Sequence, residues 1–266
     1  MPRLMSLALC VPLALLTPGA QSAEPGPPSP SRLAVKDAPA ENGKASTVFD
    51  RLVALAETGN ADAQYNLGMF YNNGIGTQRD TSSALEYFSK AAQAGHLLAS
   101  YKLGCYYAGQ FGAVVPQDKQ AALSYKLRSA EAGYDLAQHD VGTHFAKNGD
   151  MEKASIWWEK ASQQGYTPST AYLADYLSGP GASDKARGLA LLLVLKDQAP
   201  MMTEKLSQRL AGAQATLSED DRLKAERIRA AWPNAPTPLS TLARAGMSAV
   251  PALLQLAERP ELGAAR

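Results

Sequence analysis

The chain has 266 residues, which is enough for one or two domains with a substantial hydrophobic core. Apolar residues make up 45% of it, a share typical of globular proteins and too high for a wholly disordered chain. The 26 basic and 25 acidic side chains nearly cancel, so the charge gives no reason to expect nucleic acid or an acidic membrane as a partner.

Residues 1–23 are predicted to be a secretory signal peptide. Arg3 gives the positive start, and an apolar stretch runs from Leu4 to Leu16 before the small residues that end at Ala23. The stretch is shorter than the roughly 20 residues of a spanning helix. Leu9 precedes Cys10, where a lipoprotein signal has a small residue. We therefore expect a bacterial protein that is periplasmic or secreted, with no stable membrane insertion after signal cleavage.

Residues 24–46 are predicted to be a disordered linker. They are rich in proline and nearly free of large apolar side chains, and proline fixes φ and removes backbone donors. Loss of the signal would remove Cys10 and leave Cys105 as the remaining cysteine. An intramolecular disulfide is then impossible, and the fold must be held by packing.

From residue 47 to residue 198 the sequence repeats itself. One block starts at Ala63, Ala99 and Ala137, and a second block starts at Ala84, Ala122 and Ala154. The glycines that close the units are Gly59, Gly95, Gly133 and Gly165. A period of about 35 residues is typical of a solenoid of stacked helical hairpins.

Within each block the apolar positions fall at i, i+4 and i+8, which is one face of an α-helix. A glycine stands in the middle of each first block, at Gly68, Gly104 and Gly142, where it costs about 1 kcal/mol relative to alanine. We expect close approach of the partner helix at these glycines. The second helices should be capped by Asp80, Asp118 and Asp150.

These residues resemble a known repeat. The pattern Ala-x-x-x-Leu-Gly-x-x-Tyr, then Gly-x-Gly, Asp, Ala, an aromatic residue and Lys-Ala-Ala-x-x-Gly is similar to the Sel-one-like repeat, a relative of the tetratricopeptide repeat. The resemblance covers about residues 49–196. The second copy carries an insertion, Gln110 to Val115, and the fourth lacks the mid-helix glycine and is interrupted from Ser178 to Gly181. The resemblance implies a scaffold or adaptor role, often in exported bacterial proteins, and no particular ligand.

Residues 199–266 are predicted to form a helical cap and an amphipathic tail. The run from Leu189 to Leu195 before them is expected to be a buried helix. Ser218 to Asp221 has the pattern of a capping box and should open a helix that covers the end of the solenoid. A last amphipathic segment, Leu239 to Ala257, is expected to kink at Pro251 and either to dock on the solenoid or to bind a partner.

The predicted fold class is therefore all-α, a right-handed α-solenoid of stacked helical hairpins with C-terminal capping helices. No catalytic, cofactor or metal site is expected. His139 and His144 are five residues apart, which puts them on different helix faces. His144 takes the place of Phe70 and Tyr106 in the other repeats, so it is expected to pack in the core. The favoured function is a non-enzymatic scaffold for a protein or peptide. A glycan or cell-wall binder is the alternative, and a hydrolase has the least support.

The predicted binding surface is the concave side, which the first helix of each hairpin lines in a tetratricopeptide-like stack. Residues two places before the conserved apolar position should face the groove, with Ala171 ending the row. The candidate partner-binding residues are Tyr65, Met69, Asn72, Asn73, Tyr101, Cys105, His139, Thr143, Lys147 and Asp175.

Overall fold

The computed structural model describes residues 43–257 apart from 180, 183, 202 and 203. The predicted signal peptide, residues 24–42 of the predicted linker and the last residues of the tail lie outside this part of the chain. The first helix, α1, spans Gly43–Glu57. It begins inside the segment assigned to the linker, so the boundary predicted at residue 46 is too late.

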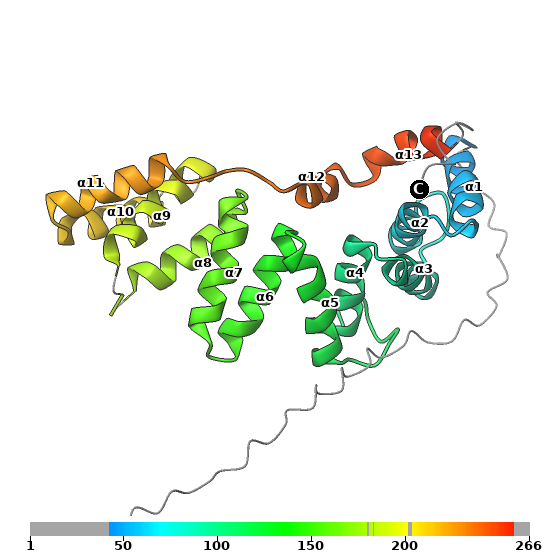
Figure 1. Cartoon of the computed structure of the whole chain (residues 1–266), viewed down its shortest axis with the longest axis horizontal. Coiled ribbons are helices and arrows are strands. Elements are labelled where there is room, and N and C mark those ends of the chain that lie inside the picture. The colour runs from blue at the N-terminus through cyan, green and yellow to red at the C-terminus, as the bar shows by residue number, and fades with distance from the viewer. Residues whose placement is uncertain (1–42, 180, 183, 202–203, 258–266) are drawn as a thin grey trace, which may run out of the picture.

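The described residues form helices that pair into successive hairpins (Figure 1). The first helices are α2 (Ala61–Asn73), α4 (Leu97–Tyr107), α6 (Asp135–Lys147) and α8 (Thr167–Ser178). The second helices are α3 (Thr81–Gln93), α5 (Lys119–Glu131), α7 (Met151–Gln163) and α9 (Lys185–Gln198). The hairpins stack in chain order, and α1 packs against α2. The prediction of an all-α solenoid of stacked helical hairpins is confirmed.

The second helices begin where the sequence predicts. The carboxylate of Asp80 accepts hydrogen bonds from the backbone N–H groups at the start of α3, and that of Asp118 does the same at α5. Asp150 accepts from the backbone N–H of Lys153 in α7. Each cap satisfies donors that have no partner within the helix, a contribution of about 1 kcal/mol.

Each of these hairpins also contains the close contact expected at the mid-helix glycine. The pairs are Gly68 with Phe88, Gly104 with Lys126, and Gly142 with Trp158. A Cβ atom added to any of the three glycines would lie 2.6–2.8 Å from the paired side chain. The absent side chain is therefore what lets the two helices of a hairpin approach. We call Phe88, Lys126 and Trp158 the floor residues.

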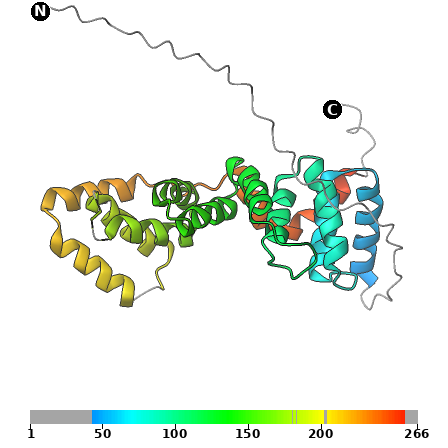
Figure 2. The same ribbon diagram turned by 90° about the horizontal axis from the view of Figure 1, so that it is seen from below.

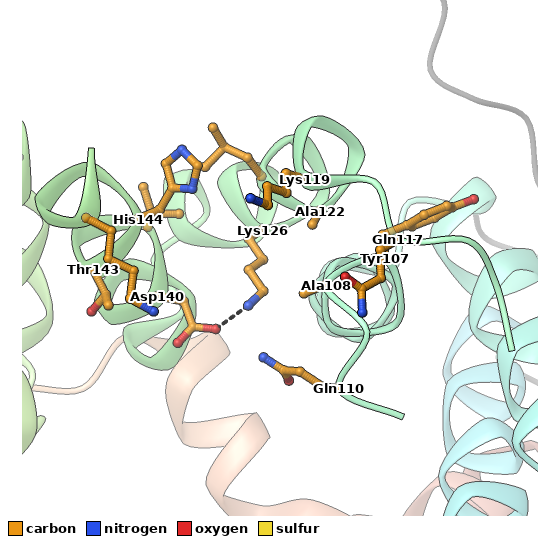
Figure 3. Close-up of a pocket in the computed structure, with 13 residues that line it drawn as sticks. Tyr107, Ala108, Gln110, Gln117, Lys119, Ala122, Lys126, Asp140, Thr143 and His144 are labelled. Atoms are coloured by element: carbon orange, nitrogen blue, oxygen red, sulfur yellow. Dashed lines mark hydrogen bonds and ion pairs between the residues drawn. The ribbon is translucent and has the colours of Figure 1, made fainter. Parts of the chain in front are cut away.

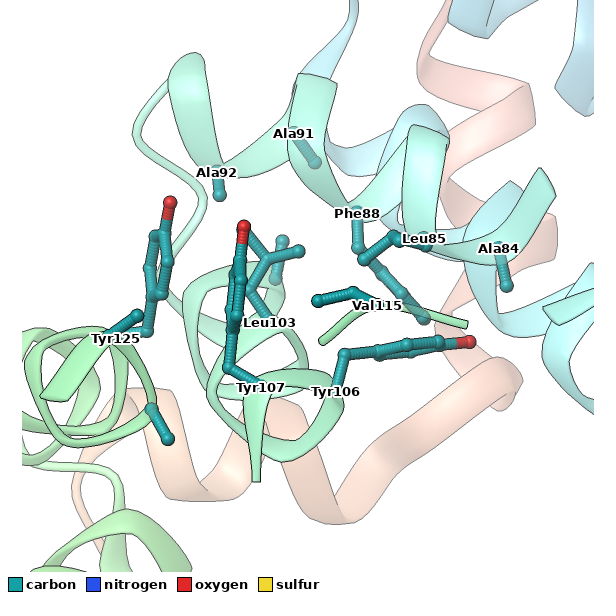
Figure 4. Close-up of a cluster of buried hydrophobic side chains, with 13 residues drawn as sticks. Ala84, Leu85, Phe88, Ala91, Ala92, Leu103, Tyr106, Tyr107, Val115 and Tyr125 are labelled. Atoms are coloured by element: carbon teal, nitrogen blue, oxygen red, sulfur yellow. The ribbon is translucent and has the colours of Figure 1, made fainter. Parts of the chain in front are cut away.

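Aromatic packing joins the helices of one hairpin and links that hairpin to its neighbour (Figure 4). Phe88 is fully buried and lies near Tyr106, and the rings of Tyr107 and Tyr125 stack with centroids 5.6 Å apart. Val115, at the end of the insertion, is 9% exposed and belongs to the same cluster. The insertion between α4 and α5 is therefore anchored in the core.

The solenoid is capped by two further helices that pack on α9, namely α10 (Glu204–Thr216) and α11 (Glu219–Ala230). Leu189 to Leu195 is buried in α9 as predicted. Ser218 caps α11 by accepting from the backbone N–H of Asp221, which confirms the predicted helix start. None of the described helices combines the length and the apolar character needed to cross a membrane.

Residues 233–257, which we call the C-terminal strap, run back along the solenoid from α11 to α1 (Figures 1 and 2). They contain α12 (Pro238–Ala245), a 3-10 turn (Gly246–Ala249) and α13 (Val250–Ala257). Val250 and Leu254 are buried against α1 and α2. The segment is therefore docked.

The predicted kink at Pro251 is wrong, because the chain bends at the turn that starts with Gly246, which has φ 53°. Pro251 lies in the first turn of α13, where a missing N–H leaves no hydrogen bond unmade.

Polar contacts fix the strap over the turns that join the hairpins. Thr237 Oγ1 donates to the carbonyl of Gly133 at 2.9 Å, and Ser240 Oγ donates to Gln164 Oε1 at 2.7 Å. Arg244 forms an ion pair with the carboxylate of Asp135, whose side chain is 5% exposed. The strap therefore covers the N-terminal ends of α6 and α8 and leaves their C-terminal ends open to other contacts.

Candidate functional site

Three of the predicted groove residues are not on an open surface. Tyr101, Cys105 and Asn72 are 7%, 3% and 8% exposed. Tyr106 Oη donates a hydrogen bond to Asn72 Oδ1 at 3.2 Å, and the ring of Tyr101 meets that of Tyr134 edge-on at 5.0 Å. The prediction that these three face a partner is wrong, because packing between neighbouring hairpins already uses their side chains.

Tyr65 is half-buried under the C-terminal strap. Its ring stacks on His96 with centroids 4.4 Å apart, and burial raises the pKa of its hydroxyl to about 12. Leu242 and Leu253 of the strap line a pocket of about 230 Å³ together with Tyr65. Met69, also half-buried, packs against the aromatic cluster of Figure 4. Neither residue therefore stands free on the surface.

Most of the remaining candidates lie in the C-terminal halves of their helices, whereas His139 lies in the N-terminal half of α6. Asn73, Lys147 and Asp175 are exposed, and Asp175 forms an ion pair with Arg209 of α10. His139 and Thr143 are half-buried on α6. The open part of the predicted row is thus confined to the ends of α2, α6 and α8.

A polar pocket of about 340 Å³ lies between α4, α5 and α6 (Figure 3). Lys126, a floor residue, forms an ion pair with Asp140 of α6 at 2.6 Å, and their side chains are 12% and 22% exposed. Tyr101 Oη donates to the same carboxylate at 3.2 Å. The lining residues are Tyr107, Ala108, Gln110, Gln117, Lys119, Ala122, Leu123, Lys126, Asp140, Val141, Thr143, His144 and Lys147.

Positive charge dominates this polar pocket. Three lysines line it, Lys119, Lys126 and Lys147, against the single carboxylate of Asp140. Burial lowers the pKa of His144, and the nearby charges of Lys126 and Lys147 lower it further. The imidazole of His144 therefore tends to stay neutral beside the lysines.

The expectation that His144 packs like Phe70 and Tyr106 is wrong. Those two residues are 4% and 1% exposed, whereas His144 is half-buried at the pocket and its Nε2 lies 3.0 Å from Nδ2 of Asn148. The sequence carried a signal for the pocket: Lys126 stands where Phe88 and Trp158 stand in the neighbouring repeats.

The next hairpin has aromatic residues at the corresponding positions. The ring of Tyr172 stacks on the floor residue Trp158 with centroids 5.1 Å apart, and His139 lies 5.5 Å from Tyr172 and 5.2 Å from Tyr166. We call Trp158, Tyr172, His139 and Tyr166 the aromatic patch. Tyr172 is 48% exposed although its ring rests on a buried tryptophan. Burial lowers the pKa of His139, and its Nδ1 lies 2.9 Å from Ser169 Oγ.

Tyr172 is an exposed residue that the repeat pattern did not indicate. The predicted row ends at Ala171, and the fourth unit departs too far from the repeat to show its register clearly. The equivalence of Tyr172 with Asp140, both sixth in their helices, was the available signal.

The described residues offer little for catalysis. No group of three or more His, Cys, Asp or Glu side chains among them is placed to hold a metal ion. Burial raises the pKa of the Cys105 thiol, which keeps it protonated and a poor nucleophile. The arrangement is suited to binding through charge and through aromatic contact.

Comparisons with known proteins agree with the fold. The sequence matches the Sel1 repeat family over residues 61–96, 97–134 and 136–166. No curated protein matches the chain. Among solved structures, a Sel1 repeat protein from Oxalobacter formigenes is 26% identical, with a TM-score of 0.52; the match covers 68% of this chain and 76% of that one.

A second solved structure supports the fold alone. It is a protective antigen present in uropathogenic Escherichia coli strains, which displays an SLR fold. It is 22% identical with a TM-score of 0.56, and the match covers 74% of this chain. The chain spans 42% of that antigen's length.

Proposed function

Because the chain is a member of the Sel1 repeat family, with three repeats in residues 61–166, we propose that it is an exported scaffold that binds a protein or peptide partner. Sel1 repeat scaffolds are in general protein-interaction modules. The proposed contact surface is the open part of α6 and α8, where the aromatic patch lies.

The observation that carries the proposal is the exposed, supported ring of Tyr172. An aromatic side chain held against a buried tryptophan loses little conformational entropy when a partner covers it. Tyr176, one turn further along α8, is 39% exposed. Aromatic anchors of this kind tend to dominate interface energy, at roughly 2 kcal/mol or more each.

A non-enzymatic role and export are parts of the same proposal. A binding role needs no catalytic group and agrees with a buried, protonated Cys105 thiol. Export rests on the sequence pattern of residues 1–23, and intact-mass measurement on protein from the native host tests it. A retained N-terminus would contradict export and leave the binding proposal in place.

The binding proposal is tested by photo-crosslinking. A photoreactive phenylalanine analogue replaces Tyr172 in one variant and Ile156 of α7 in another, because these side chains are 48% and 49% exposed. We expect a partner polypeptide to be captured at position 172 and not at position 156. Equal capture at both positions, or none at 172, would contradict the proposal. Sedimentation of the same variants with peptidoglycan identifies a glycan partner instead.

A further inference from the structure

The polar pocket lies where this sequence departs most from its own repeat. Lys126 stands where the other repeats have an aromatic floor residue. His144 of α6 stands where the other repeats have a buried aromatic residue. The insertion between α4 and α5 brings Gln110 to the same place, followed by Gln117. In Figure 3 Lys126 and Gln110 point toward Asp140, and His144 and Gln117 lie at the edges of the same pocket. One departure from a repeat is ordinary variation, but three that meet in one pocket indicate a site.

Folding alone does not require a lysine at this position. The neighbouring hairpins fill the same space with Phe88 and Trp158, which are 0% and 2% exposed. A well-packed apolar residue is usually at least as stabilising as a largely buried ion pair, since both charges must lose water. Lys126 and Asp140 must instead be fixed by each other and by Tyr101. The result is a rigid polar floor with little obvious benefit to stability.

The charges above this floor are not balanced. Asp140 neutralises Lys126, whereas Lys119 and Lys147 are exposed at the rim and form no ion pair within the described part of the chain. The side-chain amides of Gln110 and Gln117 add donors that carry no charge. A carboxylate suits this arrangement, because the ammonium groups of Lys119 and Lys147 attract an anion. Its two oxygens can accept hydrogen bonds from these groups and from the glutamine amides.

We propose that the polar pocket binds a carboxylate, supplied by an acidic side chain of the peptide that occupies the aromatic patch. The inference rests on the proposed function and narrows its partner. The pocket and the patch lie on either side of α6, with Asp140 lining the pocket and His139 belonging to the patch. A helix with its side chains is about 10 Å across. An extended chain spans that distance in about three residues. The partner therefore carries an acidic residue about three positions from an apolar or aromatic anchor.

The test uses two labelled nonapeptides, blocked at both ends, in which a leucine stands three residues from either a glutamate or a glutamine in a serine background. Binding to the full chain is measured by fluorescence anisotropy at fixed ionic strength. We expect the glutamate peptide to bind at least tenfold more tightly than the glutamine peptide. The double variant Lys119→Glu with Lys147→Glu should abolish that difference.

The matched control is Lys196→Glu with Lys205→Glu, which changes the total charge equally at exposed lysines outside the pocket. This variant should keep the preference for glutamate. No preference in the parent protein, or equal loss in both double variants, would overturn the proposal. So would inorganic phosphate that displaces the glutamate peptide at equal concentration, since that outcome means a general anion site.

The outcomes separate this inference from the proposed function. Crosslinking at position 172 without any preference for the glutamate peptide would overturn the carboxylate pocket and leave the scaffold in place. A clear preference for glutamate with no crosslinking at position 172 would contradict partner binding at the aromatic patch. The polar pocket would then bind a carboxylate without that patch.

Discussion

The polar pocket and the aromatic patch occupy equivalent places in successive hairpins. In each, a glycine in the middle of the first helix contacts the floor residue of the second helix. The sixth residue of the first helix in the following hairpin then packs on that floor residue. The contact is an ion pair in one case, Lys126 with Asp140, and a ring stack in the other, Trp158 with Tyr172.

The backbone of this repeat determines where a contact between hairpins is made, and the side chains determine its chemistry. Glycine and helix caps fix the hairpin, so the floor residue and the residue above it can change as a pair. A solenoid can thus place different binding chemistries side by side at a regular spacing.

The largest effect is expected where the floor is aromatic. Trp158→Ala should lower the free energy of unfolding by about 3–5 kcal/mol, because it removes a large side chain that is 2% exposed and leaves a cavity. Urea denaturation followed by circular dichroism measures it. Ile156→Ala on the same helix is the control, with an expected change within about 0.5 kcal/mol because Ile156 is half exposed. Similar losses in both variants would contradict the role of Trp158 as a floor residue.

The glycines should matter equally under both floors. A Cβ on Gly104 would lie 2.9 Å from the carbonyl oxygen of Ala122, and one on Gly142 would lie 3.1 Å from that of Ala154. Because backbone atoms cannot move aside cheaply, Gly104→Ala and Gly142→Ala should each destabilise by about 1–3 kcal/mol.

Gly212 of α10 gives the matched control for these glycines. Nothing lies within 4 Å of a Cβ added there, so Gly212→Ala should stabilise the protein by about 0.4–1 kcal/mol. Thermal melts of the three variants measure these changes in stability. Stabilisation by Gly104→Ala would show that the hairpin contact lies elsewhere.

The ion pair of the polar pocket should contribute less than the aromatic floor. Asp140→Asn leaves the ammonium group of Lys126, 12% exposed, without its ionic partner. We expect a loss of about 1–2 kcal/mol, below the value for a fully buried pair because Asp140 retains some contact with water. Glu219→Gln, which breaks an exposed pair with Arg222, should change stability by less than about 0.5 kcal/mol. A loss for Asp140→Asn no larger than this control would contradict a structured polar floor.

The hairpin fold could be predicted from the sequence because its signals are local. Asp80 and Gly104 each act within a single hairpin, the first through a helix cap and the second through a helix contact, and both features repeat at a regular period. The position of the C-terminal strap could not be predicted in this way. Its fixed points, such as Ser240 with Gln164 and Arg244 with Asp135, join residues far apart in the sequence.

The candidate site was predicted only in part, for a related reason. Counting from the repeat consensus places Tyr101 and His139 at the same register, yet Tyr101 is buried under its neighbours and His139 is half-exposed. Exposure at one register depends on the side chains of the next hairpin, which differ between repeats. The more informative signal was the departure from consensus at Lys126.

The smallest expected effect is on the pH dependence of stability, and it should differ between the aromatic patch and the polar pocket. Burial lowers the pKa of His139 in the folded state, whereas the unfolded chain keeps a value near 6.5. Below pH 6.5 the unfolded state therefore binds more protons than the folded state, and stability falls as the pH is lowered from 7 to 5. The carboxyl groups with lowered pKa, such as Asp62, reduce stability mainly below about pH 5. His139→Gln should flatten the decline between pH 7 and 5 in a series of urea denaturations. His144→Gln should flatten it less, because the side chain of His144 lies at the open polar pocket. If His139→Gln leaves the slope unchanged, the aromatic patch does not hold this imidazole neutral.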